Sequence, residues 1–438
     1  MKRVLIVTYH FPPNAEVGSR RPLALANYLP DFGWEPTVLT VRKPDQVAVD
    51  PRTLEELRPG VRVVRSFSLE LPRLARRLKG GKLKHEGEGE KDGIGFLNRL
   101  NRFAYDWIYL PDKRIGWVPF GVAAALRLHS ALGFDAVVTT SPPHSVHLIG
   151  LTFNGFHPAV PWVVDFRDLW TRNTATARRD LPRRMAVEQK LERRVLRRAA
   201  KLVTTSNASR ANMIPILPDG AENKVAAIPN GYEPWLAKAV QNLRPNGRFR
   251  LSITGRIYPG TVRPLLRGVD LALRLEPRMQ KKLEVLFMGH ADDPEIWRLP
   301  QRLQPFVRVE PFKNKYEAAR AQAESALLVC PVPKGPFADG WIPYRLVEYI
   351  SRKRPVLLIS EDGEARDVVR RSVVGSAARP DDVEAVAESI LAAFRRYERG
   401  DVDVTPDPVM LREWSVKNRV RQFARLLDEV TEQKGRPS

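Results

Sequence analysis

The sequence predicts an α/β protein with two doubly wound parallel-sheet domains facing each other across a cleft, and a C-terminal helix crossing back to the first domain. Three observations predict this. The chain has 438 residues, whereas single domains usually have about 100–200. Short β-rich apolar runs alternate with helical patterns, which is typical of parallel α/β sheets. The alternation breaks once, near residues 228–247, and then restarts.

The first domain is expected over residues 1–235. Apolar runs predict strands at 4–8, 36–40, 136–140, 162–164 and 202–204, and helical patterns lie at 21–29 and 118–131. A basic insertion at about 70–115 interrupts this pattern, and its polar, glycine-rich part at 80–93 is typical of a surface loop.

The second domain is expected over residues 248–410, after a polar, irregular linker. Its strands are predicted at 250–254, 283–288, 307–309, 326–329 and 355–359. The final segment, 411–438, contains an amphipathic helix with one apolar face made by Val416, Val420, Phe423, Leu427 and Val430. We expect this helix to pack on the first domain.

The charge balance indicates an anionic partner, because 72 Lys and Arg residues against 50 Asp and Glu residues give a net charge of +22. Nucleic acid is the less favoured partner, since the sequence has no zinc-ligand spacing and no RNA-binding aromatic or GXXG motif. The single cysteine, Cys330, lies in an apolar run, which predicts an inert core thiol and fits a cytoplasmic protein.

Two patterns in the insertion favour an anionic membrane surface. Residues 71–84 are cationic with interleaved leucines, and Phe96, Leu100, Phe103 and Trp107 follow at helical spacing. The same spacing fits a helix packed on the first domain by its aromatic face. Because no run approaches the ~18–20 apolar residues of a spanning helix, we expect peripheral contact at the inner face of the cell membrane.

Six motifs, in this order, resemble glycosyltransferase family 4 in the branch that builds bacterial surface polysaccharides: Tyr9–Pro13, Thr140–Ser145, Pro161–Trp170, Ile228–Tyr232, Thr254–Gly260 and Pro343–Tyr349. The resemblance implies the GT-B fold, with two Rossmann-like domains. It also implies a retaining enzyme that uses a nucleotide-diphosphate sugar, a lipid-linked or polysaccharide acceptor, and neither a cofactor nor an obligatory metal.

The donor site is expected in the second domain, where positive groups must face the leaving diphosphate. Arg345 stands where the family usually has lysine, and Glu348 stands at the ribose-binding acid; an exposed charge pair on a helix is the alternative. Gly255 allows a close approach to a ligand and Arg256 offers a second cation, although a solvated arginine after a strand fits as well. Arg263 is a further cation candidate.

One departure from the family concerns the sugar ring. Members often carry a glutamate eight residues before the ribose acid, and this chain has Gly340 there. Acid pairs such as Asp401 and Asp403 lie in a proline-rich segment, and we predict no metal site.

The acceptor site is expected at the strand ends of the first domain. The loop after the first strand contributes Gly18, Arg20 and Arg21, although a plain helix start explains the arginines equally well. A second strand end contributes Asp165, Arg167 and Asp168, for which a buried ion pair is the alternative reading.

The Pro-Pro turn places His144, and the resemblance implies that this histidine touches the transferred sugar and belongs with Arg256 and Arg345 in catalysis. A structural hydrogen bond is the simpler role. Two other functions remain open for the whole chain: a GT-B-type nucleotide-sugar epimerase, and a non-catalytic partner protein that keeps the fold.

Overall fold

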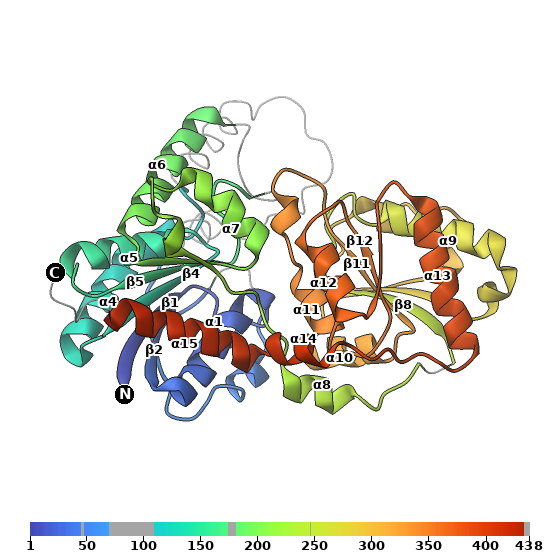
Figure 1. Ribbon diagram of the computed structural model, residues 1–438, viewed down its shortest axis with the longest axis horizontal. Helices are drawn as coiled ribbons and strands as arrows, with labels where there is room; N and C mark the ends of the chain where they lie inside the picture. Colours follow the sequence, from blue (N-terminus) through green and yellow to red (C-terminus); the bar gives the residue numbers. More distant parts are fainter. Residues whose placement is uncertain (45–47, 70–108, 174–180, 246, 433–438) are drawn as a thin grey trace, which may run out of the picture. The chain divides into compact units, whose positions relative to one another are not determined.

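The computed structural model describes residues 1–44, 48–69, 109–173, 181–245 and 247–432, which form two compact units (Figure 1). Unit 1 contains the described parts of 1–204 and 213–226 together with 420–432. Unit 2 contains 205–212 and the described residues of 227–419. Each unit is built on one parallel sheet, which confirms the predicted α/β class.

The described part of unit 1 holds a seven-stranded sheet in the order β3-β2-β1-β4-β5-β6-β7. The neighbouring pairs from β3 to β6 are parallel. The strands are β1 (Lys2–Thr8), β2 (Trp34–Val41), β3 (Arg62–Ser66), β4 (Ala136–Ser141), β5 (Trp162–Phe166), β6 (Lys201–Thr204) and β7 (Val225–Ala227).

The helices of unit 1 bury their apolar sides on this sheet. Three of them pack in sequence, α4 (Val118–Leu132) on α5 (Ser145–Phe156) and α5 on α6 (Pro182–Arg198). Their core includes Ile149 and Phe153 of α5 and the strand residues Val137 and Val164, all at most 1% exposed. The continuous apolar runs of the central strands reflect burial on both faces of the sheet.

The C-terminal helix α15 (Val416–Glu432) packs on unit 1 as predicted, together with α1 (Arg20–Tyr28). Asp428 accepts hydrogen bonds from Lys2 Nζ at 3.0 Å and from Trp34 Nε1 at 3.2 Å. The Arg21 guanidinium lies 5.9 Å from the centre of the Phe423 ring. These contacts tie the end of the chain to its first two strands.

The described part of unit 2 holds a six-stranded parallel sheet in the order β10-β9-β8-β11-β12-β13. The strands are β8 (Phe249–Thr254), β9 (Leu283–Met288), β10 (Val307–Glu310), β11 (Leu327–Pro331), β12 (Val356–Ile359) and β13 (Gly375–Ala378). The helices are α7 (Asn207–Met213), α8 (Pro234–Val240), α9 (Arg263–Leu275), α10 (Lys315–Ala323), α11 (Tyr344–Tyr349), α12 (Glu364–Ser372), α13 (Val383–Glu398) and α14 (Pro408–Glu413).

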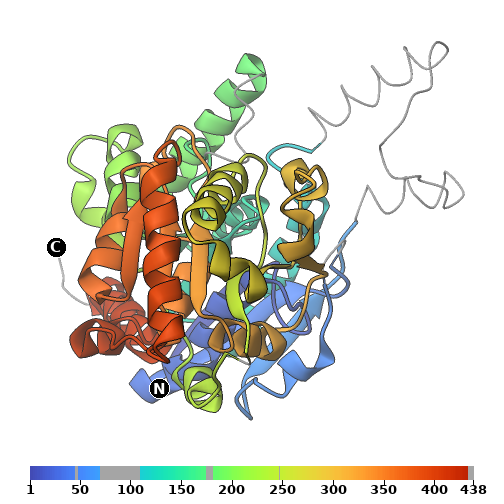
Figure 2. The same cartoon turned by 90° about the vertical axis from the view of Figure 1, so that its right-hand side faces the viewer.

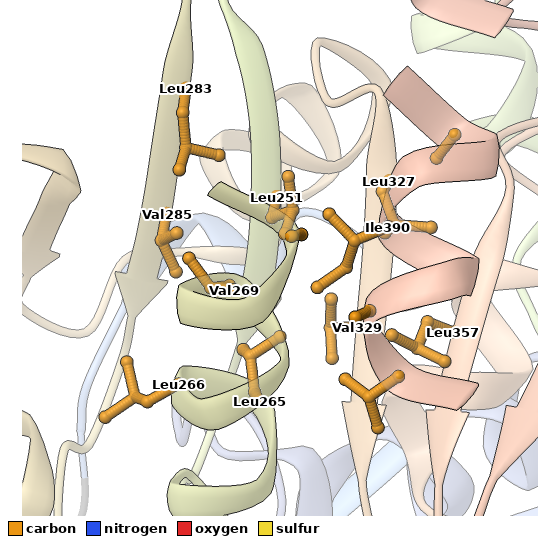
Figure 3. Packing of buried hydrophobic residues seen from close by; sticks show 14 of the residues in the cluster. Leu251, Leu265, Leu266, Val269, Leu283, Val285, Leu327, Val329, Leu357 and Ile390 are labelled. Carbon is orange, nitrogen blue, oxygen red and sulfur yellow. The ribbon is translucent and has the colours of Figure 1, made fainter. Parts of the chain in front are cut away.

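Two long helices, α9 and α13, lie side by side on one face of this sheet (Figure 2). Val269 of α9 and Ile390 of α13 reach toward Leu251, Val329 and Leu357 on the central strands (Figure 3). Cys330 is buried as predicted, and burial raises the pKa of its thiol to about 12.

The structure differs from the sequence-based expectations in four places. The edge strands β3, β7 and β13 were not predicted. The predicted linker contains a helix, α8, whose Leu236 and Val240 pack on Ala319 and Ala323 of α10. The sequence also predicts a helix from Pro343, a residue that suits a first helical turn, to about Arg352. The observed helix is shorter, because Pro343 precedes α11 and turns follow Tyr349.

The fourth difference concerns apolar length. Residues Ile115–Leu132 form an 18-residue helical stretch with mean hydropathy 1.2, so the chain does contain a run long enough to span a bilayer by length and composition. This stretch packs on α5 and on the sheet of unit 1. The predicted membrane patterns at 71–84 and 96–107 lie outside the described residues.

Candidate functional site

Both sheets have a topological switch point, where ligands of doubly wound folds usually bind beyond the carboxyl ends of the strands. In unit 1 the strand order reverses between β1 and β4, and in unit 2 it reverses between β8 and β11. Most of the predicted site residues lie at these two points, and each cluster is described within its own unit.

Asp165 and Arg21 form a buried ion pair in unit 1. Arg21 donates from Nε and Nη2 to the two carboxylate oxygens, both at 2.9 Å, and Thr140 Oγ1 donates to Asp165 Oδ2 at 2.7 Å. Asp165 is 0% exposed and Arg21 is 9% exposed. The geometry therefore gives this pair a structural role in joining α1 to β5, and its contact with an acceptor stays a prediction.

Arg167 fastens the loops that follow three strand ends. Its Nε donates to Ser141 O and its Nη2 to Pro142 O, both at 2.7 Å, while Nη1 donates to Gly18 O. Burial lowers the pKa of Arg167 to about 10, against the attraction of Asp165 and Asp168, so the guanidinium stays charged at neutral pH.

Gly18 is closely packed by two side chains of this cluster. A Cβ at Gly18 would lie 3.3 Å from His10 Cγ and 3.4 Å from Arg167 Nη1. The other two predicted residues lie at the rim: Arg20 is half-buried at the start of α1, and Asp168 is exposed after β5. Their roles as acceptor contacts stay predictions.

Two neutral histidines flank this arginine. Burial and the Arg167 charge lower the pKa of both His144 and His10 to about 3, with a further contribution from Arg114 at His10. His144 stacks on Trp170 at 5.2 Å between ring centres, and its buried Nδ1 has no partner among the described residues. If the ring proton lies on the other nitrogen, this unpartnered Nδ1 is able to accept a hydrogen bond from a ligand hydroxyl.

His10 was not predicted as a site residue, although it lies in the first motif. Its Nδ1 lies 2.6 Å from Asn14 Nδ2, so Nδ1 accepts this hydrogen bond and the ring proton is assigned to Nε2. Asn14 is fully buried and holds the ring in place. The signal in the sequence that could have identified His10 is the pair Tyr9 and His10, which directly follows the first buried strand.

In unit 2, Gly255 and Arg256 follow β8. Gly255 has φ +90°, a left-handed conformation that favours glycine. Its predicted close approach to a ligand stays a prediction. The Arg256 side chain is 60% exposed and its Nε lies 2.7 Å from Asp292 Oδ2. A ligand phosphate at Arg256 would compete with this carboxylate.

Arg345 reaches the same strand end from α11. Its Nη2 donates to the carbonyl oxygen of Arg256, and its buried Nη1 has no partner among the described residues. Buried polar groups are nearly always hydrogen-bonded. Arg396 Nε on α13 is likewise buried without a hydrogen-bond partner among the described residues, but Arg345 Nη1 belongs to a side chain that reaches the end of β8, at the switch point of the sheet.

Glu348 lies one turn along the same helix and is buried at 9% exposure. Gln322 Nε2 donates to Glu348 Oε2 at 3.3 Å and to Thr254 Oγ1 at 2.9 Å. The Thr254 N–H donates to Tyr349 Oη at 3.0 Å, and burial raises the pKa of that phenol to about 12. This network fixes α11 against the end of β8.

Arg263 lies apart from these groups. It pairs with Glu295 at 2.5 Å on the exposed start of α9, and the hydrogen bond and charge of Glu295 raise its pKa. Gly340 has no room for the family's acid, because a Cβ there would lie 2.5 Å from Ser209 Oγ. The departure noted in the sequence thus has a steric cause.

A pocket of about 220 Å³ lies between the loops that follow β11 and β12. It is lined by Asp339, Trp341 and Ser360 among others, and the buried Ser360 Oγ has no partner among the described residues. The loop beside it contains Phe337 with φ +66°, a strained conformation for a bulky side chain.

Within the described residues, no group of three or more His, Cys, Asp or Glu side chains is placed to hold a metal ion. Asp401 and Asp403 pair with arginines instead.

Residues 18–231 match the model of a glycosyl transferase 4-like domain. The fold is similar to HepE of Anabaena in complex with UDP, with 13% identity over 99% of this chain and 98% of that chain and a TM-score of 0.56. It is also similar to a trehalose 6-phosphate synthase from Burkholderia multivorans, with 13% identity over 100% and 99% of the chains and a TM-score of 0.59. A lipopolysaccharide outer core galactosyltransferase, WaaB, matches at 11% identity over 99% and 100% with a TM-score of 0.55. The search of curated proteins found no match.

Proposed function

Because residues 18–231 match the model of a glycosyl transferase 4-like domain and the chain has a GT-B-like fold, we propose that this protein is a retaining glycosyltransferase that uses a nucleotide-diphosphate sugar. The acceptor is a lipid-linked or polysaccharide glycan of the cell surface. The observation that carries the proposal is the buried Arg345 Nη1, which has no acceptor among the described residues and which the diphosphate of a donor would supply with one.

The donor binds in unit 2. Glu348 accepts hydrogen bonds from the ribose hydroxyls, and Arg345 and Arg256 face the diphosphate oxygens. The bond between the anomeric carbon and the diphosphate breaks with its electron pair on the leaving phosphate. Fixed cations stabilise this developing charge more than they stabilise the bound substrate. HepE of Anabaena, whose structure was solved in complex with UDP and with UDP-glucose, supports this donor class.

The acceptor binds in unit 1, beside His144, Arg20 and Asp168. Its hydroxyl oxygen bonds to the anomeric carbon, and its proton passes to the departing phosphate. No residue is assigned as a nucleophile, and the reaction as proposed needs no metal, so turnover should persist in EDTA.

Thermal-shift and calorimetric titrations with UDP, GDP, ADP and their sugar conjugates test this proposal. We expect one nucleoside-diphosphate series to bind the wild type and to bind Arg345→Ala at least tenfold more weakly. The control is Arg370→Ala, an exposed arginine on α12 that pairs with Asp367.

Three results would speak against the proposal. Binding that is equal in both variants removes Arg345 from the donor site. Conversion of one sugar nucleotide into another without an acceptor identifies an epimerase. Absence of binding to any nucleotide identifies a non-catalytic protein that keeps the fold.

A further inference from the structure

The outer surface of the helical layer α4–α5–α6 in unit 1 has an unusual charge distribution. Six basic side chains on α6 are exposed, and none of them has an ion-pair or hydrogen-bond partner in the part of the chain that the structure describes: Arg183, Lys190, Arg193, Arg194, Arg197 and Arg198. At about 100° per residue they fall within an arc of about 140°, along a helix about 25 Å long. They therefore form one cationic face.

The acids of α6 do not neutralise this face, because both point inward. Glu188 pairs with Arg184 at 2.7 Å and accepts from Trp170 Nε1, and Glu192 accepts from Thr171. Glu188 and Glu192 are 5% and 2% exposed. The outward cations consequently repel one another without compensation, which is a cost that a partner of opposite charge would remove.

The neighbouring helices α4 and α5 carry no acidic residue at all. Most of the apolar stretch that contains α4 is not fully buried. Phe156 of α5 is 66% exposed, and Phe120 of α4, which is 36% exposed, packs edge-on against Phe67 at 4.8 Å between ring centres. Since α4 packs on α5 and α5 on α6, the two acid-free helices adjoin the helix that carries the cationic face.

We propose that this surface docks unit 1 on an anionic lipid bilayer. The cations of α6 meet the headgroup phosphates, each contributing about a fivefold factor in affinity, and the rings of α4 and α5 contact the interfacial region. Nucleic acid fits less well, because the cationic face lacks aromatic side chains for stacking on bases. The surface concerns binding alone, so its test is independent of the proposed reaction.

The experiment is sedimentation of the full chain with vesicles of phosphatidylcholine, with and without phosphatidylglycerol. We expect binding only to the anionic vesicles, and weaker binding at high salt, because the Debye length shrinks from about 10 Å at 0.1 M to about 3 Å at 1 M. The triple variant Arg193→Gln, Arg194→Gln, Arg197→Gln should bind about 10²-fold more weakly.

A matched control removes the same charge elsewhere. Arg267→Gln, Arg298→Gln, Arg399→Gln changes three exposed arginines of unit 2 and lowers the net charge equally. This control should bind vesicles as the wild type does, whereas Phe156→Asp should weaken binding by placing an acid on the apolar part. Circular dichroism and nucleotide titration confirm that each variant is folded.

Four results would overturn the inference: no binding of the wild type to anionic vesicles, equal binding of the two triple variants, wild-type binding by Phe156→Asp, or tighter binding to duplex DNA than to vesicles at the same salt. A protein that binds vesicles through α6 but no nucleotide sugar keeps this inference and refutes the proposed function. A protein that binds a nucleotide sugar but not anionic vesicles keeps the proposed function and refutes this inference.

Discussion

The buried pair of Arg21 and Asp165 leads to a prediction about stability that separates structural from functional carboxylates. We expect Asp165→Asn to destabilise unit 1 strongly and Asp168→Asn, which removes a charge near Arg167 but no hydrogen bond among the described residues, to destabilise it less. The two acids lie three residues apart, yet Asp165 is 0% exposed and Asp168 is exposed after the strand.

The magnitude follows from the contacts of Asp165. Its carboxylate accepts two hydrogen bonds from Arg21 and one from Thr140. Asparagine removes the negative charge that faces the buried Arg21 guanidinium and one of its two acceptor oxygens, and breaking a buried pair in this way costs about 3–5 kcal/mol in comparable proteins. With a urea dependence of about 2–3 kcal/mol per M, the unfolding midpoint should fall by about 1–2 M.

Tryptophan fluorescence is the appropriate assay, because the largest fully buried side chains include four tryptophans, all in unit 1: Trp34, Trp117, Trp162 and Trp170. The fluorescence change on urea unfolding therefore reports mainly on this unit. The double variant Arg21→Met, Asp165→Asn also removes the positive charge of Arg21, and it should recover part of the stability that Asp165→Asn loses.

The reasoning is refuted if Asp165→Asn and Asp168→Asn lower the urea midpoint equally. It is also refuted if the midpoint shift of the double variant equals the sum of the shifts of Arg21→Met and Asp165→Asn. Either result would mean that the buried ion pair does not hold α1 on β5.

Three further predictions concern single residues. Arg345→Ala should lower turnover about 10²–10³-fold, as for loss of a transition-state charge donor, while Arg345→Lys should retain more activity in steady-state assays; equal rates for wild type and Arg345→Ala would exclude the role. Glu192 has its pKa raised by burial from 4.5 to about 7, so the folded state keeps a proton that the unfolded state releases, and stability should fall as pH rises from about 4.5 to 7. Glu192→Gln should flatten this dependence in urea midpoints measured against pH. In Gly255→Ala the new Cβ has free space, but φ is +90°, so the free energy of unfolding should fall by about 1–2 kcal/mol. Gly289→Ala should lower the melting temperature more than Gly255→Ala does, because its Cβ would meet the Gly255 carbonyl oxygen.

The sequence predicted the central strands of both sheets because they are buried on both faces and read as continuous apolar runs. The three strands that it missed are edge strands, where only one neighbour stabilises pairing and the apolar signal is weak. β13 (Gly375–Ala378) has no large apolar residue, and β7 (Val225–Ala227) has three residues in total. Helix α8 was hidden in the linker because only Leu236 and Val240 carry its apolar face.

The sequence was sufficient to predict at which sheet edge the candidate residues lie, but not which side chains they contact. Residues that follow buried parallel strands must gather at one sheet edge, and this rule found Gly18, Arg167, Gly255 and Arg256. It could not show that Asp165 is paired with Arg21, a residue 144 positions away in the chain. The steric reason for Gly340 likewise depends on contact with Ser209, which no local pattern reveals.

The buried thiol of Cys330 makes the natural chain a ready background for site-specific labelling. With its pKa raised to about 12, almost no thiolate is present at neutral pH, and the sulfur is enclosed by the core of unit 2. Maleimide reagents should therefore modify an introduced surface cysteine and leave the native one unreacted. A polarity-sensitive dye on Phe156→Cys would report lipid contact at α5 directly, and a second label on unit 2 would follow the distance between the units as ligands bind.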